Sequence, residues 1–156
     1  MDEILKVLDK LRACEDALEW LAGLPEGTTL QAAWEACERG DWLLWILVRM
    51  HPRDSEYHRF IIRSAQRALR IAGADVDPSL SAALEAKKVW YRSVTVKELE
   101  EPVVWKEDPA WVAAWALVWD RLCRERSPQW ELEKKLWAAD IHELFERPEV
   151  KIKKKK

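Results

Sequence analysis

The sequence contains no asparagine, and it has only three glutamines, two methionines and four glycines in 156 residues. Charged residues make up 35% of the chain, compared with about 25% in a typical soluble globular protein. Few thermolabile residues together with many charges are typical of proteins from thermophiles. We therefore expect a thermophilic source.

The sequence also lacks the patterns of several kinds of functional site. It has no Gly-rich phosphate loop and no His-Glu-x-x-His metal motif. Cys14, Cys37 and Cys123 lie far apart, without Cys-x-x-Cys spacing or a neighbouring base, so we expect buried free thiols in a reducing compartment. We predict no cofactor, no metal and no catalytic residue, and thus a protein that is not an enzyme.

No apolar run reaches the ~18 residues that a membrane span requires. The first residues are charged, unlike those of a signal peptide. We expect a cytoplasmic protein, or one in the host cytoplasm if a phage encodes it.

Apolar residues recur every three or four positions along most of the chain, which predicts α-helices. We predict an all-α fold of about seven to eight helices with irregular orthogonal or up-down packing, in a single domain over residues 1–147. Residues 148–156 are expected to form a flexible lysine-rich tail. Residues 103–105 could be extended. The expected helices cover residues 2–21, 29–39, 42–50, 55–72, 78–91, 95–101, 109–125 and 128–146.

Several helix starts have clear capping signals. Thr28 or Thr29 can cap the second helix, and Thr95 and Glu98 have the spacing of a capping box. The pairs Asp108-Pro109 and Ser127-Pro128 each combine a capping side chain with a first-turn proline.

Residues 30–50, LQAAWEACERGDWLLWILVRM, read as helix, tight turn, helix. Gly40 is expected to end the first helix and Asp41 to cap the second. The second helix is apolar nearly all round, which predicts a place at the centre of the core. We interpret this stretch as the structural hub of the fold, formed by Trp34, Gly40, Asp41, Trp42 and Trp45.

The blocks "ACEDALEWL", "LQAAWEACERGDWLLWIL" and "ALEAKKVWYRSVTVKELEE", followed by a Trp/Ala-rich helix, resemble a family of small all-helical proteins. These proteins occur in bacteriophages and bacteria, and some are described as immunity proteins. The resemblance covers roughly residues 13–145 and implies an all-helical fold in a phage or defence setting; it implies no catalytic residues. The chain departs from the pattern in its prolines Pro102 and Pro109, its shortened "AWVAAWALVW" block and its lysine tail. The signature residues are Ala33, Trp34, Cys37, Arg39, Gly40, Asp41, Trp42 and Trp45.

Arg59, Arg63, Arg67 and Arg70 are spaced to share one outer helix face. This face is either solvated and paired with neighbours such as Glu56, or a cationic surface for an acidic protein or for phosphates. Both interpretations remain open from the sequence.

Most of the eleven tryptophans are expected in the core. If two or three of Trp90, Trp105, Trp111 and Trp130 are exposed together, they mark a partner-binding patch, because tryptophan and arginine dominate interface hot spots. Of these we select Trp105, Trp111 and Trp130 as candidates.

The other candidate groups have simpler interpretations. His51, His58 and His142 fit no metal motif, so we expect solvated or capping roles. Asp140 and Glu143 beside His142 are expected to be exposed charges on an amphipathic helix.

Two functions remain after these exclusions. The first is a non-enzymatic interaction protein that binds and modulates a host or cognate protein. The second is a nucleic-acid-associated protein that uses the arginine face and the tail. The five tail lysines leave −7 on the rest of the chain from a net charge of −2, and an acidic body disfavours a broad nucleic-acid surface.

Overall fold

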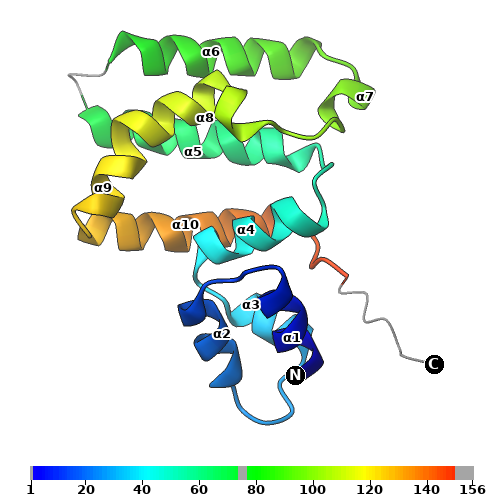
Figure 1. Ribbon diagram of the computed structural model, residues 1–156. Helices are drawn as coiled ribbons and strands as arrows, with labels where there is room; N and C mark the ends of the chain where they lie inside the picture. Colours follow the sequence, from blue (N-terminus) through cyan, green and yellow to red (C-terminus); the bar gives the residue numbers. More distant parts are fainter. Residues whose placement is uncertain (1, 74–76, 150–156) are drawn as a thin grey trace.

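The computed structural model describes residues 2–73 and 77–149, which form helices and loops with no strand among them. The predicted all-α fold is confirmed (Figure 1). The helices are α1 (Asp2–Lys10), α2 (Glu15–Ala22), α3 (Leu30–Ala36), α4 (Gly40–Met50), α5 (Glu56–Ala72), α6 (Pro78–Ser93), α7 (Val96–Leu99), α8 (Pro109–Ala114), α9 (Asp120–Arg124) and α10 (Pro128–Leu144), with a short 3-10 turn η2 (Trp105–Glu107) and a π-helical segment η3 (Trp115–Trp119).

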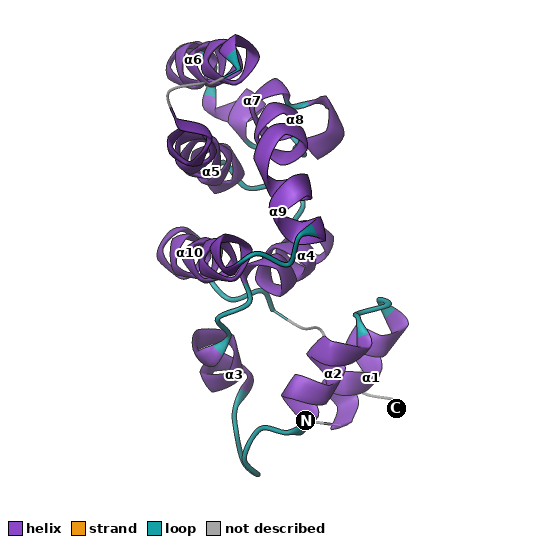
Figure 2. Ribbon diagram, turned by 90° about the vertical axis from the view of Figure 1, so that its left-hand side faces the viewer, coloured by secondary structure: helices purple, strands orange, loops and turns teal. Residues whose placement is uncertain are grey.

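Helices α4 and α10 lie side by side across the middle of the molecule. Helices α5, α6 and α8 lie on one side of this pair, and α1, α2 and α3 lie on the other (Figures 1 and 2). Leu43, Leu44 and Leu47 of α4 are buried, so the predicted central position of this helix is confirmed. None of the helices within the described ranges is both long and apolar enough to cross a membrane.

The single helix expected over residues 2–21 is wrong, because the chain breaks between α1 and α2. Arg12 takes a positive φ of 62°, and the amide of Ala13 donates to the carbonyl of Leu8. A helix commonly ends with one residue in this left-handed conformation, although glycine usually occupies the position. The break turns α2 back along α1 and accounts for one helix more than the sequence predicts.

The start of α4 also differs from the prediction. Gly40 is the first residue of α4 rather than the end of α3, and Asp41 does not cap the helix. The Asp41 carboxylate instead accepts hydrogen bonds of 2.9 and 2.7 Å from the guanidinium of Arg39. Gly40 lies against α10, where a Cβ would lie only 2.5 Å from the backbone nitrogen of Ala138. Glycine is required there because the two central helices approach so closely.

The other capping predictions are confirmed. Thr29 accepts a hydrogen bond from the amide of Ala32, and Thr95 and Glu98 form the reciprocal capping box. Asp108 accepts from two amides in the first turn of α8, and Ser127 caps α10.

Two predictions about the later part of the chain concern residues 103–105 and the tail at residues 148–156. Residues 103–105 do not form a strand, since Trp105 begins the 3-10 turn η2. The tail was expected to begin at residue 148, but Pro148 is buried against the rest of the protein; Glu149 is exposed. The remaining tail residues, 150–156, lie outside the described residues.

A continuous helix is formed by α8, η3 and α9, with a wider π turn in its middle that carries Trp115 and Trp119. Trp119 is fully buried, Trp111 is half-buried and Trp115 is 37% exposed. All three pack against Trp137 of α10, with ring centroids 5.5 to 6.4 Å apart. The tryptophans of this helix therefore join it to α10, in agreement with the expectation that most tryptophans serve the core.

Candidate functional site

The four candidate arginines of α5 do not share one outer helix face, so the prediction common to both interpretations is wrong. Arg63 contacts Asp140 at 3.0 Å and Glu143 at 2.8 Å on α10. Arg67 contacts Asp140 at 2.6 Å. These two arginines point toward a neighbouring helix whose acidic residues neutralise them.

The ends of the arginine series behave differently. Arg59 is exposed and pairs with Glu56 at 2.8 Å, as the solvated interpretation predicts. Arg70 is exposed on the last turn of α5. Only these two retain the exposure that a partner-binding face would need.

Glu133 of α10 is the buried end of this ion-pair network. Its side chain is 0% exposed and accepts a hydrogen bond of 2.8 Å from Arg67. Burial raises the pKa of Glu133, and the positive charge of Arg67 opposes that effect. Asp140 is also largely shielded from solvent, so the prediction that it is an exposed charge is wrong. The network holds α5 against α10.

The candidate tryptophans do not form an exposed patch. Trp130 is only 7% exposed and packs against Trp137 at 5.4 Å. Trp105 and Trp111 are half-buried and contact each other at 4.7 Å beside the core. Trp130 is thus a core residue, and the other two are only partly exposed and pack against the core.

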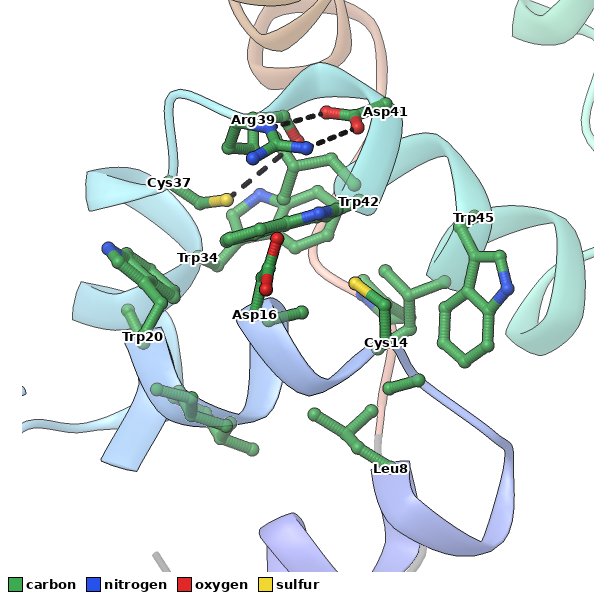
Figure 3. A pocket seen from close by; sticks show the side chains of 18 of the residues that line it. Leu8, Cys14, Asp16, Trp20, Trp34, Cys37, Arg39, Asp41, Trp42 and Trp45 are labelled. Carbon is green, nitrogen blue, oxygen red and sulfur yellow. Dashed lines mark hydrogen bonds and ion pairs between the residues drawn. The ribbon is translucent and has the colours of Figure 1, made fainter. Parts of the chain in front are cut away.

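A largely apolar groove of about 420 Å³ lies among α1, α2, α3 and α4 (Figure 3). Trp20 of α2 and Trp42 of α4 meet across it at 6.1 Å. Trp34 lies on the α3 side and is buried, whereas Trp45 of α4 is half-buried. Pro148 lines the same groove, so the end of the described chain returns to the N-terminal helices.

Charged side chains lie at the edge of the groove. The guanidinium of Arg39 stacks 4.1 Å above the Trp42 ring while it is held by Asp41. These bonds raise the pKa of Arg39, and the side chain stays charged. Asp16 points toward Trp42 from α2 (Figure 3). Arg12 also lines the groove, at the break between α1 and α2. The groove therefore combines aromatic surface with charges of both signs.

Four residues of the predicted hub line this groove: Trp34, Asp41, Trp42 and Trp45. Gly40 faces the other way, against α10. The hub thus joins α4 to the core on one side and presents a concave surface on the other. Periodicity alone could not reveal the groove, since the groove depends on the unpredicted break at Arg12.

The cysteines differ from the expectation of three buried thiols. Cys37 is buried, but Cys14 and Cys123 are exposed. Cys14 and Cys37 both line the groove, and burial raises the pKa of Cys37, which favours its thiol form. The described part of the chain contains no group of three or more His, Cys, Asp or Glu side chains that could hold a metal ion.

The histidines also occupy three different environments. His51 is exposed, and His142 forms a 2.9 Å hydrogen bond with the carbonyl of Trp34. His58 is only 5% exposed, so a solvated role is wrong for it. It contacts Lys87, which forms an ion pair with Asp108. Sequence spacing could not predict this buried polar cluster, because its members come from three separate segments.

Comparisons of this chain with family models, with curated proteins and with solved structures found no match.

Proposed function

We propose that this protein binds a partner protein in the groove among α1, α2, α3 and α4 and modulates that partner without catalysing a reaction. The partner would insert the apolar face of a helix, a recurring mode of recognition by helical grooves. The resemblance described above supports a phage-encoded or defence-linked protein that acts on a host or cognate protein in the cytoplasm.

The observation that carries this proposal is the partly open cluster of Trp20, Trp42 and Trp45 around an apolar groove. Tryptophan supplies a large contact area at low cost in side-chain entropy, and it is enriched in interface hot spots. Arg39 is fixed in place by Asp41, so little of its mobility remains to be lost on binding. The flat guanidinium stacked on Trp42 extends the rigid surface that the apolar face of a partner helix can cover.

The alternative, a nucleic-acid-associated protein, has less support. Arg63 and Arg67 form ion pairs with Asp140 of α10. The continuous cationic face on which the alternative was based is therefore absent. The lysine tail remains its main argument. Binding of DNA or RNA that weakens steeply with salt, and that is lost when residues 151–156 are removed, would favour it over the groove.

The groove proposal is tested with two charge-introducing variants on different faces. Ile46→Glu places a carboxylate in the groove, whereas Leu132→Glu places one on an exposed position of α10 outside it. Tagged wild-type protein and both variants are used to capture partners from a lysate of the source organism or its host. We expect wild-type protein and Leu132→Glu to retain the same partner in stoichiometric amount, and Ile46→Glu to lose it.

The captured partner is then purified and its affinity is measured by calorimetry. Loss of a hot-spot contact of about 2 kcal/mol weakens binding about 30-fold. Circular dichroism establishes that each variant is folded, and Trp45→Ala serves as a second groove variant if Ile46→Glu is not. Retention of the partner by the folded groove variant, or capture of no stoichiometric partner by the wild type, would contradict the proposal.

A further inference from the structure

Three buried polar side chains meet where α5, α6 and α8 pack together (Figure 1). Lys87 is on α6, His58 is on α5, and Asp108 caps the start of α8. They are 8%, 5% and 9% exposed, respectively. The groove among α1–α4 lies at the opposite end of the molecule (Figure 1). The cluster is therefore separate from the surface that the proposed partner would cover.

The side-chain nitrogen of Lys87 lies between the other two groups. Its Nζ donates to Oδ2 of Asp108 at 2.5 Å and lies 2.9 Å from Nδ1 of His58. A lysine ammonium only donates hydrogen bonds, so Nδ1 of His58 accepts. Burial lowers the pKa of His58 to about 4, which agrees with a neutral ring. The nitrogen is thus held against a carboxyl group on one side and a proton acceptor on the other.

The second oxygen of Asp108 lies where a negative charge is stabilised. Oδ1 accepts hydrogen bonds from the backbone amides of Ala110 and Trp111, both at 3.1 Å. Two backbone amides that converge on one oxygen form the arrangement that stabilises an oxyanion when a nucleophile attacks a carbonyl carbon. The Asp108 carboxyl group therefore has a nucleophile beside one oxygen and oxyanion donors at the other.

Burial also favours the uncharged forms of Lys87 and Asp108. Charges that are shielded from water lose their hydration, and this loss favours transfer of a proton from the ammonium to the carboxylate. The transfer follows the 2.5 Å hydrogen bond and leaves an amine beside a carboxylic acid. The centre of the Trp90 ring lies 4.3 Å from Nζ and gives the amine an apolar neighbour. Desolvated lysine amines act as nucleophiles toward carbonyl carbons.

We propose that Lys87 and Asp108 condense spontaneously into an amide bond that joins α6 to the start of α8. After the first proton transfer, the amine attacks Cγ of Asp108, and Oδ1 carries the negative charge toward the amides of Ala110 and Trp111. Nδ1 of His58 takes a second proton from the nitrogen and returns it to Oδ2. The Nζ–Cγ bond forms, the Cγ–Oδ2 bond breaks, and Oδ2 leaves as water with two protons from Lys87. No oxidant, cofactor or other reactant is required.

The surroundings suit a reaction that occurs once and releases water. All three reacting side chains line a cavity of about 440 Å³, which has room for the released molecule. Pro109 follows Asp108 and has no backbone N–H, so the Asp108 carboxyl group cannot form a cyclic imide with the next residue instead. The bond removes the charges of Lys87 and Asp108 together, whereas the burial of His58, the main cause of its lowered pKa, remains.

Mass spectrometry of the denatured full chain tests the bond without a variant. While the folded protein is incubated at neutral pH, we expect most molecules to fall below the mass of the sequence by one water molecule. Trypsin should then release residues 71–88 joined to residues 107–121, because it does not cleave after an acylated lysine. A chain that keeps the full mass of its sequence after prolonged incubation would overturn the proposal.

Four variants assign the bond to this cluster. Lys87→Met and Asp108→Ala should keep the full mass of their sequences. The control Lys88→Met changes the next lysine of α6, which pairs with Glu85, and should lose one water as the wild type does. His58→Ala should form the bond at least about tenfold more slowly. Loss of water in Lys87→Met or Asp108→Ala, or an unchanged rate in folded His58→Ala, would overturn the proposal; the joined peptides of the wild type decide the matter if the variants do not fold.

Discussion

The substitution Gly40→Ala would place a methyl group in the closest contact between the two central helices. The added Cβ would lie 2.5 Å from the backbone nitrogen of Ala138 and 2.5 Å from the carbonyl oxygen of Lys134. It would be nearer still to the Cβ of Trp137. Since two of these neighbours are backbone atoms of α10, no side-chain rotation can relieve the contact.

The magnitude follows from how far the helices must move. An ordinary Cβ contact begins at 3.4 Å, so α4 and α10 would have to separate by about 1 Å. A gap of that size loses a quarter to a half of the attraction between the atoms that face it. Overpacking of a core commonly costs 1–3 kcal/mol, and we expect about 3 kcal/mol here because backbone limits the response. For a chain of this length, that loss lowers Tm by roughly 6–12 °C.

Gly23→Ala is the matched control. Gly23 has a right-handed φ of −79°, and its nearest neighbours to an added Cβ are carbonyl oxygens at 3.4 and 3.6 Å. The control should leave Tm unchanged or raise it slightly, since alanine reduces the freedom of the unfolded chain. Thermal unfolding followed by circular dichroism compares the two variants. Equal melting temperatures for Gly40→Ala and wild type would refute the close helix contact.

Three further predictions concern buried side chains. Burial and the Lys87 charge lower the pKa of His58 from 6.5 to about 4. The stability that the neutral ring contributes is therefore complete above pH 6.5 and is lost as the pH falls toward 4. Urea titrations should show a loss of about 3 kcal/mol in the free energy of unfolding across this window, and His58→Leu should not show it. Arg67→Met should lower the free energy of unfolding by about 3–5 kcal/mol, because it leaves the buried Glu133 unpaired. The control Arg59→Met, at an exposed ion pair, should lower it by about 0–1 kcal/mol. Similar urea midpoints for the two variants would contradict the ion-pair network between α5 and α10. A thiol reagent should modify two cysteines rapidly in the native protein and Cys37 only on unfolding, and rapid modification of all three would contradict its burial.

Local signals in the sequence predicted much of the fold. The capping roles of Thr29, Thr95, Asp108 and Ser127 follow from side chains that bond within their own helical turn. The central position of α4 follows from an apolar surface that continues around the helix. Such features depend on neighbours in sequence, and so they can be predicted without knowledge of the tertiary structure.

The errors occur where distant segments meet. The spacing of Arg63 and Arg67 predicted a shared face, but only the position of α10 decides whether that face meets solvent or carboxylates. Gly40 has the spacing of a helix terminator, yet its role depends on α10 lying against it. Arg12 gives no glycine-like signal for the left-handed turn that separates α1 from α2. The groove was missed for this last reason.

The most direct test of the proposed partner-binding groove replaces Trp45 with a photoreactive phenylalanine analogue and illuminates the protein in a lysate of its source or host. Trp45 lines the groove, and the same analogue at exposed Leu132 of α10 provides a control outside it. We predict one dominant crosslinked protein from position 45, competed away by the unlabelled wild-type chain, and none from position 132. The same crosslinks from both positions, or no competed crosslink from position 45, would contradict the account.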